Sequence, residues 1–232
     1  MVINIYDKNT LQIVAHPVAT SLEDFKDNPV LFYPEWDNTR HICSYTEFQN
    51  PILVAGNIRE MTKEELYKQG KYNLASNERL IDGKIKAEIL DDFEYIENNQ
   101  IKFKRDEKIE SLKKELSALK VEYSEKEFLF QGKYWQKNRE KGDRDNLTGI
   151  VVLLMATGQT EYNGWKVIDK DTGEHVYLKL TLDDFKLMAL HMQEQVTKAM
   201  KVESELIVKL NILSDNELKA FDSRKEYESL WS

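Results

Sequence analysis

The sequence has only one cysteine, Cys43, among its 232 residues. No disulfide can therefore form within the chain, and no cluster of cysteines can hold zinc. Small secreted domains that depend on disulfides are excluded as a class. The N-terminal segment MVINIYDKNT has neither a basic start nor a long apolar stretch, so we expect no secretion signal. The expected location is the reducing cytoplasm of the cell that makes the protein.

Long apolar runs are also missing. The longest, Ile150–Ala156, is too short to cross a bilayer, so no membrane partner is expected. The net charge is -8 and the pI is about 5.2. An acidic chain has no general attraction to phosphates, so nucleic acid is not expected as a partner either. The cations between Lys133 and Arg144 are interspersed with acids and are interpreted as a solvated charged face.

The residues and spacings of common catalytic sites are scarce. None of the four histidines is paired with another at metal-binding spacing, and H-E-x-x-H, G-x-S-x-G and the phosphate-loop motif do not occur. His41 and Cys43 lie two residues apart, but a nucleophile pair also needs an oxyanion hole, so a structural role is favoured. The charges of Asp143, Arg144 and Asp145 are interpreted as helix-start charges. We therefore expect no enzyme activity, no catalytic residues, no cofactor and no bound metal.

The patterns predict an α+β protein in four segments. Residues 1–60 form a β-rich region of short strands, which contains all four prolines of the chain. Within it, Phe32, Tyr33 and Trp36 cluster closely in sequence. A small core under a loop is the favoured interpretation of these rings, and a platform for a ligand such as a surface carbohydrate is the alternative.

Residues 61–104 are predicted to form a short helix and two hairpins. The helix lies within Met61–Gly70, with Thr62 as its N-cap and a glycine at its end. The hairpins turn at Asp82-Gly83, the strongest short hairpin signal, and at Asn98-Asn99.

Residues 105–127 are predicted to form one charged connecting helix that resembles a coiled coil. Its apolar residues follow a heptad stripe, but two heptads are too few for a stable isolated coiled coil. The stripe must therefore pack on another helix. In a monomer the expected partner is the helix at Leu182–Leu213 of the same chain, and in a dimer or trimer it is a sister subunit. The stripe consists of Ile109, Leu112, Leu116, Leu119 and Tyr123.

Residues 128–232 are predicted to form a C-terminal α+β domain. A helix that ends at Gly158 is apolar on nearly all sides, which predicts that it is buried at the centre of this domain. A hairpin follows, and Thr181 with Asp184 then opens a long final helix with a capping box. The terminal residues Tyr227 and Trp231 either dock on the chain or contact another subunit.

The C-terminal segment resembles a domain of phage and prophage tail-module proteins. The likeness rests on four motifs in a fixed order: F-x-F-x-G-K-Y at Phe128–Tyr134, R-D-N-L at Arg144–Leu147, a strand-pair tryptophan at Trp165, and L-T-x-x-D at Leu180–Asp184. A second segment, residues 58–89 with EMTKEE and a later D-G turn, resembles tail-fibre and tail-assembly proteins from prophages of low-GC Gram-positive bacteria. Residues 1–55 resemble no family.

The resemblance implies a non-enzymatic protein of a phage tail or a tail-like bacteriocin. Its expected partner is a tail-fibre (receptor-binding) protein or a baseplate protein, and its role is that of a structural component or of a chaperone for fibre assembly. It would act in the cytoplasm of the bacterial host during assembly, and as a component it would remain in the virion tail. The alternative is a tail module that binds or hydrolyses surface glycans. The candidate partner-binding residues are aromatic or apolar: Phe32, Tyr33, Trp36, Ile109, Leu112, Leu116, Leu119, Tyr227 and Trp231.

Overall fold

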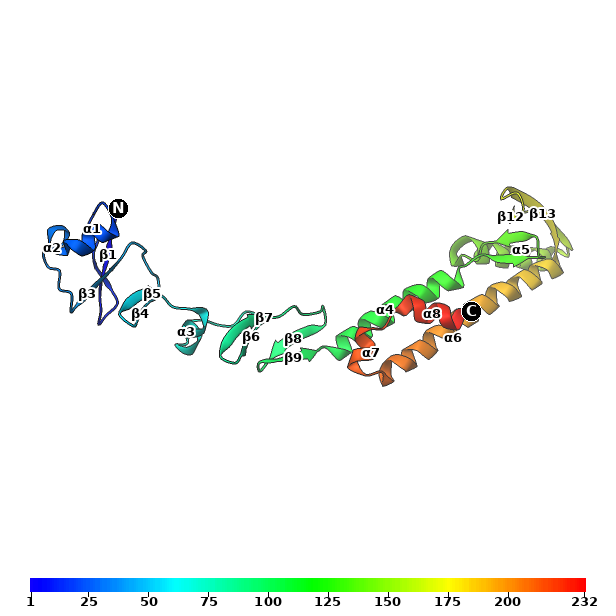
Figure 1. Ribbon diagram of the computed structural model, residues 1–232. Coiled ribbons are helices and arrows are strands. Elements are labelled where there is room, and N and C mark those ends of the chain that lie inside the picture. Colours follow the sequence, from blue (N-terminus) through cyan, green and yellow to red (C-terminus); the bar gives the residue numbers. More distant parts are fainter. The chain divides into compact units, whose positions relative to one another are not determined.

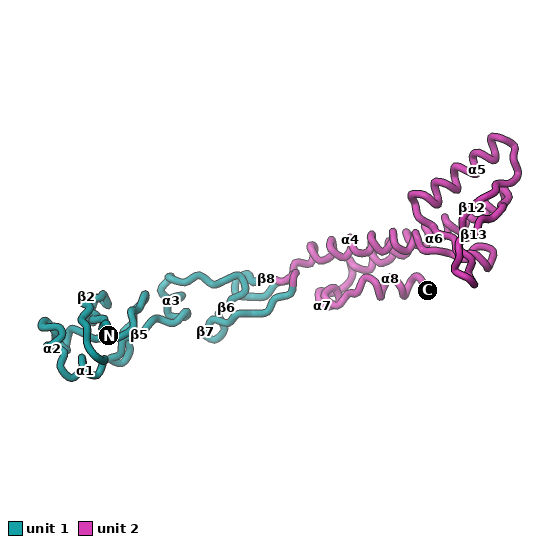
Figure 2. Tube along the Cα trace, turned by 90° about the horizontal axis from the view of Figure 1, so that it is seen from above, with its two compact units in different colours: residues 1–91, 95–102 teal, residues 92–94, 103–232 magenta.

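The computed structural model describes all residues, 1–232, and the fold is α+β (Figure 1). The chain divides into two compact units, which Figure 2 shows in different colours. Unit 1 comprises residues 1–91 and 95–102, and unit 2 comprises residues 92–94 and 103–232. Unit 1 thus contains most of residues 1–104, and unit 2 contains residues 105–232 together with residues 92–94 and 103–104.

Unit 1 begins with a three-stranded antiparallel sheet of order β2-β1-β3. Two short helices accompany it, and the first of them is capped by Ser21, whose side chain accepts the backbone N–H of Asp24. Ile3, Ile5 and Phe25 are fully buried and form the centre of a small core. The elements are β1 (Asn4–Asp7), β2 (Ile13–Ala15), α1 (Leu22–Asp27), α2 (Pro29–Phe32) and β3 (His41–Ser44).

Three two-stranded hairpins and one helix follow. The predicted turns Asp82-Gly83 and Asn98-Asn99 are confirmed, and a third turn lies at Ala55-Gly56. All six turn residues have positive φ, which the tight turns of two-residue hairpins require. The elements are β4 (Pro51–Val54), β5 (Asn57–Glu60), α3 (Lys63–Lys68), β6 (Glu78–Ile81), β7 (Lys84–Ala87), β8 (Glu94–Glu97) and β9 (Gln100–Phe103).

This hairpin region contains no buried apolar side chain. Between Ser44 and Ile109 the only buried residue is Glu78. Its carboxylate accepts bonds from Lys63 Nζ at 2.8 Å, from the Tyr72 hydroxyl at 2.6 Å and from the Ala75 N–H at 3.0 Å. Polar contacts and turns therefore hold this region, rather than a hydrophobic core.

Unit 2 contains a helical core built around two long helices. The heptad stripe of α4 packs against α6 and α8, and all five of its residues are buried in one cluster with side chains from those helices. The prediction that the stripe docks on a helix is confirmed, and within the structure the partner is the same chain. The helices are α4 (Arg105–Ser124), α6 (Leu182–Ile212), α7 (Asp215–Lys219) and α8 (Ser223–Trp231).

The second part of unit 2 is a four-stranded antiparallel sheet of order β10-β11-β12-β13. A separate hydrophobic cluster lies between this sheet, α5 and the first turns of α6. The capping box of Thr181 and Asp184 at the start of α6 is confirmed, and so is Gly158 as the left-handed end of α5. The elements are β10 (Phe128–Phe130), β11 (Tyr134–Gln136), η1 (Glu140–Arg144), α5 (Asp145–Thr157), β12 (Glu161–Asp169) and β13 (His175–Thr181).

One helix, α6, supplies side chains to both clusters of unit 2. Phe185, Met188 and Met192 belong to the sheet cluster, whereas Ala199 and Leu206 belong to the helical cluster. The two cores therefore share one continuous backbone.

Candidate functional site

A groove of about 800 Å³ lies in unit 2, between α5 and the strands β11 and β12. The helix α5 forms one wall of the groove and the strands form the other, and both lie near the N-terminal end of α6 (Figure 1). Aromatic, charged and small residues line the groove: Trp135, Gln136, Lys137, Arg139, Asp143, Asp145, Asn146, Gly149, Ile150, Leu153, Tyr162, Gly164, Trp165, Lys166, Val167, Ile168 and His175.

The helical wall is one face of α5. Asn146, Gly149, Ile150 and Leu153 recur at three- and four-residue spacing, so they share that face. Gly149 is an exposed glycine in the helix interior, and a side chain added there would meet no atom within 4 Å. The missing side chain leaves open the middle of this wall.

The expectation that α5 is buried on several sides at the centre of the domain is wrong. Only Leu147 and Leu154 are buried, whereas Val152 is 60% exposed and Met155 is 67% exposed. The reason is that α5 packs on α6 and β12 through the side that carries Leu147 and Leu154, whereas the side that carries Val152 and Met155 is exposed. The apolar sequence of α5 is thus divided between a narrow buried stripe and an exposed apolar face.

The strand wall is rigidly held by Trp165. Its indole is buried, and Nε1 donates to Gln136 Oε1 at 2.8 Å. The ring also packs edge-on against Phe185, with ring centroids 5.3 Å apart. Because Phe185 is fully buried at the start of α6, the sheet cluster fixes this side of the groove.

A charged loop closes one end of the groove. Asp143 accepts Arg139 Nε at 2.8 Å, the Arg139 backbone N–H at 3.1 Å and Arg139 Nη2 at 3.3 Å. Between them, Gly142 has φ 112°, a conformation that side chains other than glycine rarely adopt. Both carboxylate oxygens of Asp143 are therefore engaged by Arg139.

The residues expected to contact partners are mostly internal. Ile109, Leu112, Leu116 and Leu119 are covered by α6 and α8, so within this fold the stripe is not a surface for another subunit. The hydroxyl of Tyr227 is also buried and donates to the Ala199 carbonyl at 2.8 Å.

Trp231 likewise docks on the chain, since its ring lies 5.1 Å from that of Tyr123. Of the two alternatives for the C-terminus, packing within the chain is the one that the structure contains.

The N-terminal rings also contribute to a core. Phe32, Tyr33 and Trp36 are half-buried, and each packs against Phe25 or His41. The Phe25–Trp36 contact is edge-on at 5.3 Å. The favoured interpretation, a small core under a loop, describes these rings better than an open platform does.

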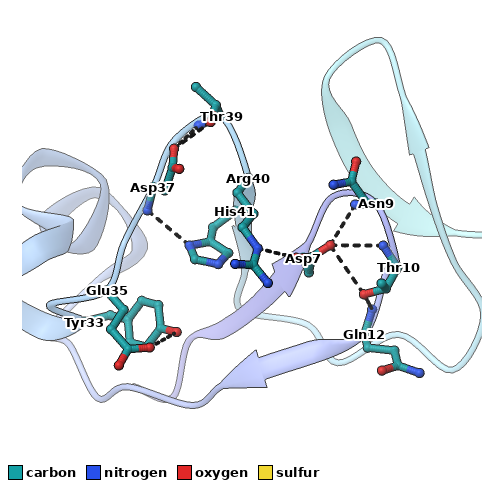
Figure 3. A network of polar contacts seen from close by, with 10 residues as sticks. All are labelled: Asp7, Asn9, Thr10, Gln12, Tyr33, Glu35, Asp37, Thr39, Arg40 and His41. Carbon is teal, nitrogen blue, oxygen red and sulfur yellow. Dashed lines mark hydrogen bonds and ion pairs between the residues drawn. The ribbon is translucent and has the colours of Figure 1, made fainter.

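A polar network surrounds Asp7 in unit 1 (Figure 3). The Asp7 carboxylate accepts Arg40 Nε at 2.7 Å and the backbone N–H groups of Asn9 and Thr10 at 2.9 and 3.1 Å. Nearby, the Asp37 N–H donates to Nδ1 of His41 at 3.1 Å. The bonds from Arg40 and the backbone lower the pKa of Asp7 to about 2 from 3.8.

Asp7→Asn is expected to reduce the acid sensitivity of the fold. Because the pKa of Asp7 is depressed in the folded chain, its carboxylate stabilises the fold above pH 3.8, and this contribution is lost as the pH falls toward about 2. Thermal unfolding of wild type and variant between pH 5 and pH 2 measures the effect. The melting temperatures should differ most at pH 5 and converge toward pH 2. Melting temperatures that differ by the same amount at pH 5 and pH 2 would contradict this role of the Asp7 carboxylate.

The thiol of Cys43 is not activated. Burial raises its pKa, so the protonated thiol is favoured over the nucleophilic thiolate. Nδ1 of His41 accepts a hydrogen bond from the backbone N–H of Asp37. The geometry thus agrees with a structural role for both residues.

No group of three or more His, Cys, Asp or Glu side chains is placed to hold a metal ion. No helix has the length and hydropathy needed to span a membrane. Comparisons with protein-family models, curated proteins and solved structures gave no match.

The groove was not predictable from the sequence because its lining residues come from four separate segments: 135–139, 143–153, 162–168 and His175. One signal was present in the sequence: Gly149 interrupts an otherwise strongly apolar helix.

Gly149→Ala is expected to stabilise the protein by about 1 kcal/mol, because alanine is a better helix former and the added methyl group enters open space. Urea denaturation measures this change. Gly158→Ala is the matched control and should destabilise the protein, because Gly158 has φ 69° at the helix end. A destabilised Gly149→Ala variant would contradict the open space beside α5.

Proposed function

We propose that the chain is a non-enzymatic binding protein of a phage tail or phage-tail-like bacteriocin. Its partner is a tail-fibre (receptor-binding) protein or a baseplate protein. It serves as a structural component of the tail or as a chaperone of fibre assembly. As a chaperone it acts in the host cytoplasm during assembly, and as a component it is also carried in the tail.

The observation that carries the proposal is the exposed apolar face of α5 beside an open groove. Val152 and Met155, three residues apart on one face of α5, are 60% and 67% exposed, and Leu153 on the groove side is 48% exposed. Apolar side chains gathered in this way on a surface mark sites where another protein binds. The ordered tail-module motifs of residues 128–184 supply the kind of partner, since they span this same helix and its sheet.

Binding of the full-length chain to purified fibre and baseplate proteins of the same tail module tests the proposal. Met155→Glu, which places a charge on the exposed face of α5, is expected to weaken binding at least tenfold without lowering the melting temperature. Leu187→Glu on α6, where the wild-type side chain is 46% exposed, is the matched control and should bind normally. If none of the tail proteins binds the wild-type chain, the proposal is wrong.

Mass spectrometry of purified particles separates the two roles. Stoichiometric presence identifies a structural component, whereas absence from particles combined with binding to the free fibre identifies an assembly chaperone. Light scattering on the isolated chain gives its oligomeric state, for which a dimer or a trimer remains a proposal.

A further inference from the structure

We infer that the groove receives an extended segment of the partner protein, which adds as a strand to the open edge of β12 at Lys166. The inference rests on the proposed function and specifies how that partner is held. Strand addition of this kind uses backbone hydrogen bonds for affinity and side-chain pockets for selectivity.

The pairing of β12 shows which of its backbone groups are free. On one side, the Asp169 N–H donates to the Glu174 carbonyl at 2.9 Å, toward β13. On the other side, the Lys170 N–H donates to the Lys133 carbonyl at 3.0 Å, toward β11. Backbone groups alternate between the two sides of a strand, so the N–H and C=O of Ile168 and Lys166 face the β11 side.

Lys166 has no strand beside it on that side. The pairing of β11 with β12 ends at Trp135 opposite Ile168, and the next position along β11, opposite Lys166, would be Lys137. Lys137 lies outside the strand, and no backbone hydrogen bond joins it to Lys166. The N–H and C=O of Lys166 are therefore unpaired where β12 lines the groove.

The residues that follow β11 leave the edge of β12 because the buried side chain of Asn138 is hydrogen-bonded elsewhere. Asn138 is completely buried, and its Nδ2 donates to the Ser124 carbonyl and to Gln195 Oε1, both at 2.7 Å. These contacts tie the residues after β11 to the end of α4 and to α6. The edge of β12 is thus held open by the fold.

The groove also indicates the chemistry of the occupant. A helix satisfies its own backbone groups and could not use the free edge, whereas an extended peptide can. Ile150 and Leu153 on the opposite wall offer apolar contact, and Gly149 leaves room for a side chain of the peptide.

The charges of the groove favour an acidic residue in the peptide. Arg139 is paired with Asp143, and Lys137 Nζ lies 3.8 Å from Glu127, but Lys166 is exposed and forms no ion pair. The carboxylate of Asp145 also lines the groove without an ion pair, but it lies on the α5 wall, opposite the strand that carries Lys166. Cross-strand neighbours of opposite charge stabilise a strand pair. The occupant is therefore an extended segment with an acidic residue opposite Lys166 and apolar residues facing α5.

Two substitutions at Lys166 separate the backbone from the side chain. Lys166→Pro removes the free N–H, and because that N–H faces away from β13, the β12–β13 pairing is preserved. Lys166→Ala keeps the N–H and removes only the charge. Using overlapping 12-residue peptides of the fibre and baseplate proteins as probes, we expect one acidic-apolar peptide to bind the full-length wild-type chain in fluorescence polarisation.

For that peptide, Lys166→Pro should weaken binding at least tenfold, and Lys166→Ala should weaken it only about two- to fivefold. A peptide series that carries one backbone N-methyl group at successive positions provides a readout that does not depend on how the variants fold. Binding should fall at alternate positions, because only alternate amides face β12.

Other results would overturn strand addition. Undiminished binding to Lys166→Pro would do so, and so would an N-methyl series without alternation. Self-association of the wild-type chain that is lost in Lys166→Pro would also overturn it, because the edge of β12 would then pair with a second copy of the chain. If whole tail proteins bind wild type and Lys166→Pro equally, strand addition fails and the proposed function stands. If no tail protein binds at all, both fail.

Discussion

Phe185→Ala is expected to lower the free energy of unfolding by about 3–5 kcal/mol, the range measured when a buried aromatic side chain is truncated. Phe185 is 0% exposed at the start of α6. It packs edge-on against Trp165 and Tyr162, with ring centroids at 5.3 and 6.1 Å. Removal of the ring leaves a cavity between the sheet and α6 and withdraws the support of the strand wall of the groove.

Urea unfolding, with the transition midpoint and slope determined separately, measures this loss. Leu187→Ala is the matched control two residues along the same helix, since its side chain is 46% exposed and its truncation should change stability by about 0.5 kcal/mol or less. A Phe185→Ala variant as stable as this control would mean that the sheet cluster is not packed as described.

Leu116→Ala is expected to lower the free energy of unfolding by about 2–5 kcal/mol. Leu116 is 0% exposed at the centre of the helical cluster, between α4, α6 and α8. Val121→Ala on the same helix, where the side chain is 51% exposed, is the control and should have little effect.

The same measurement tests whether the heptad stripe packs within one chain. When the contacts of Leu116 lie within the chain, the unfolding midpoint does not depend on protein concentration. A midpoint that rises with concentration in the wild type, and no longer does so in Leu116→Ala, would place the stripe between subunits instead.

Local features of the fold were predictable from the sequence because neighbouring residues determine them. Asp82-Gly83 forms its turn through the positive φ of two adjacent residues, and Thr181 with Asp184 caps α6 through bonds within one turn. The α4 stripe predicted a buried face in the same way. In a monomer its partner was predicted to be the helix at Leu182–Leu213, and α6 is that partner in the structure. The pattern alone did not decide between this helix and a sister subunit, because a heptad stripe can pack on a helix of either origin.

The burial of α5 and the groove beside it depended on long-range geometry. An apolar helix predicts burial, but which of its sides is covered depends on how much of the sheet and of α6 reaches it. The open edge of β12 arises in the same way, since it requires Asn138 to be anchored on α4 and α6. No pattern in a single segment contains that information.

The absence of buried apolar side chains between Ser44 and Ile109 also affects the dynamics of the chain. Each hairpin there is a two-stranded unit whose contacts span only a few residues, and such units are marginally stable in water. We expect them to open one at a time, without unfolding the clusters of unit 2. Amide hydrogens in β4–β9 therefore exchange with solvent through small local openings, whereas those in the buried turns of α4 and α6 exchange only when a whole core is lost. We therefore expect two classes of amide exchange rate: fast exchange in the hairpins without buried apolar side chains, and slow exchange where apolar side chains are buried.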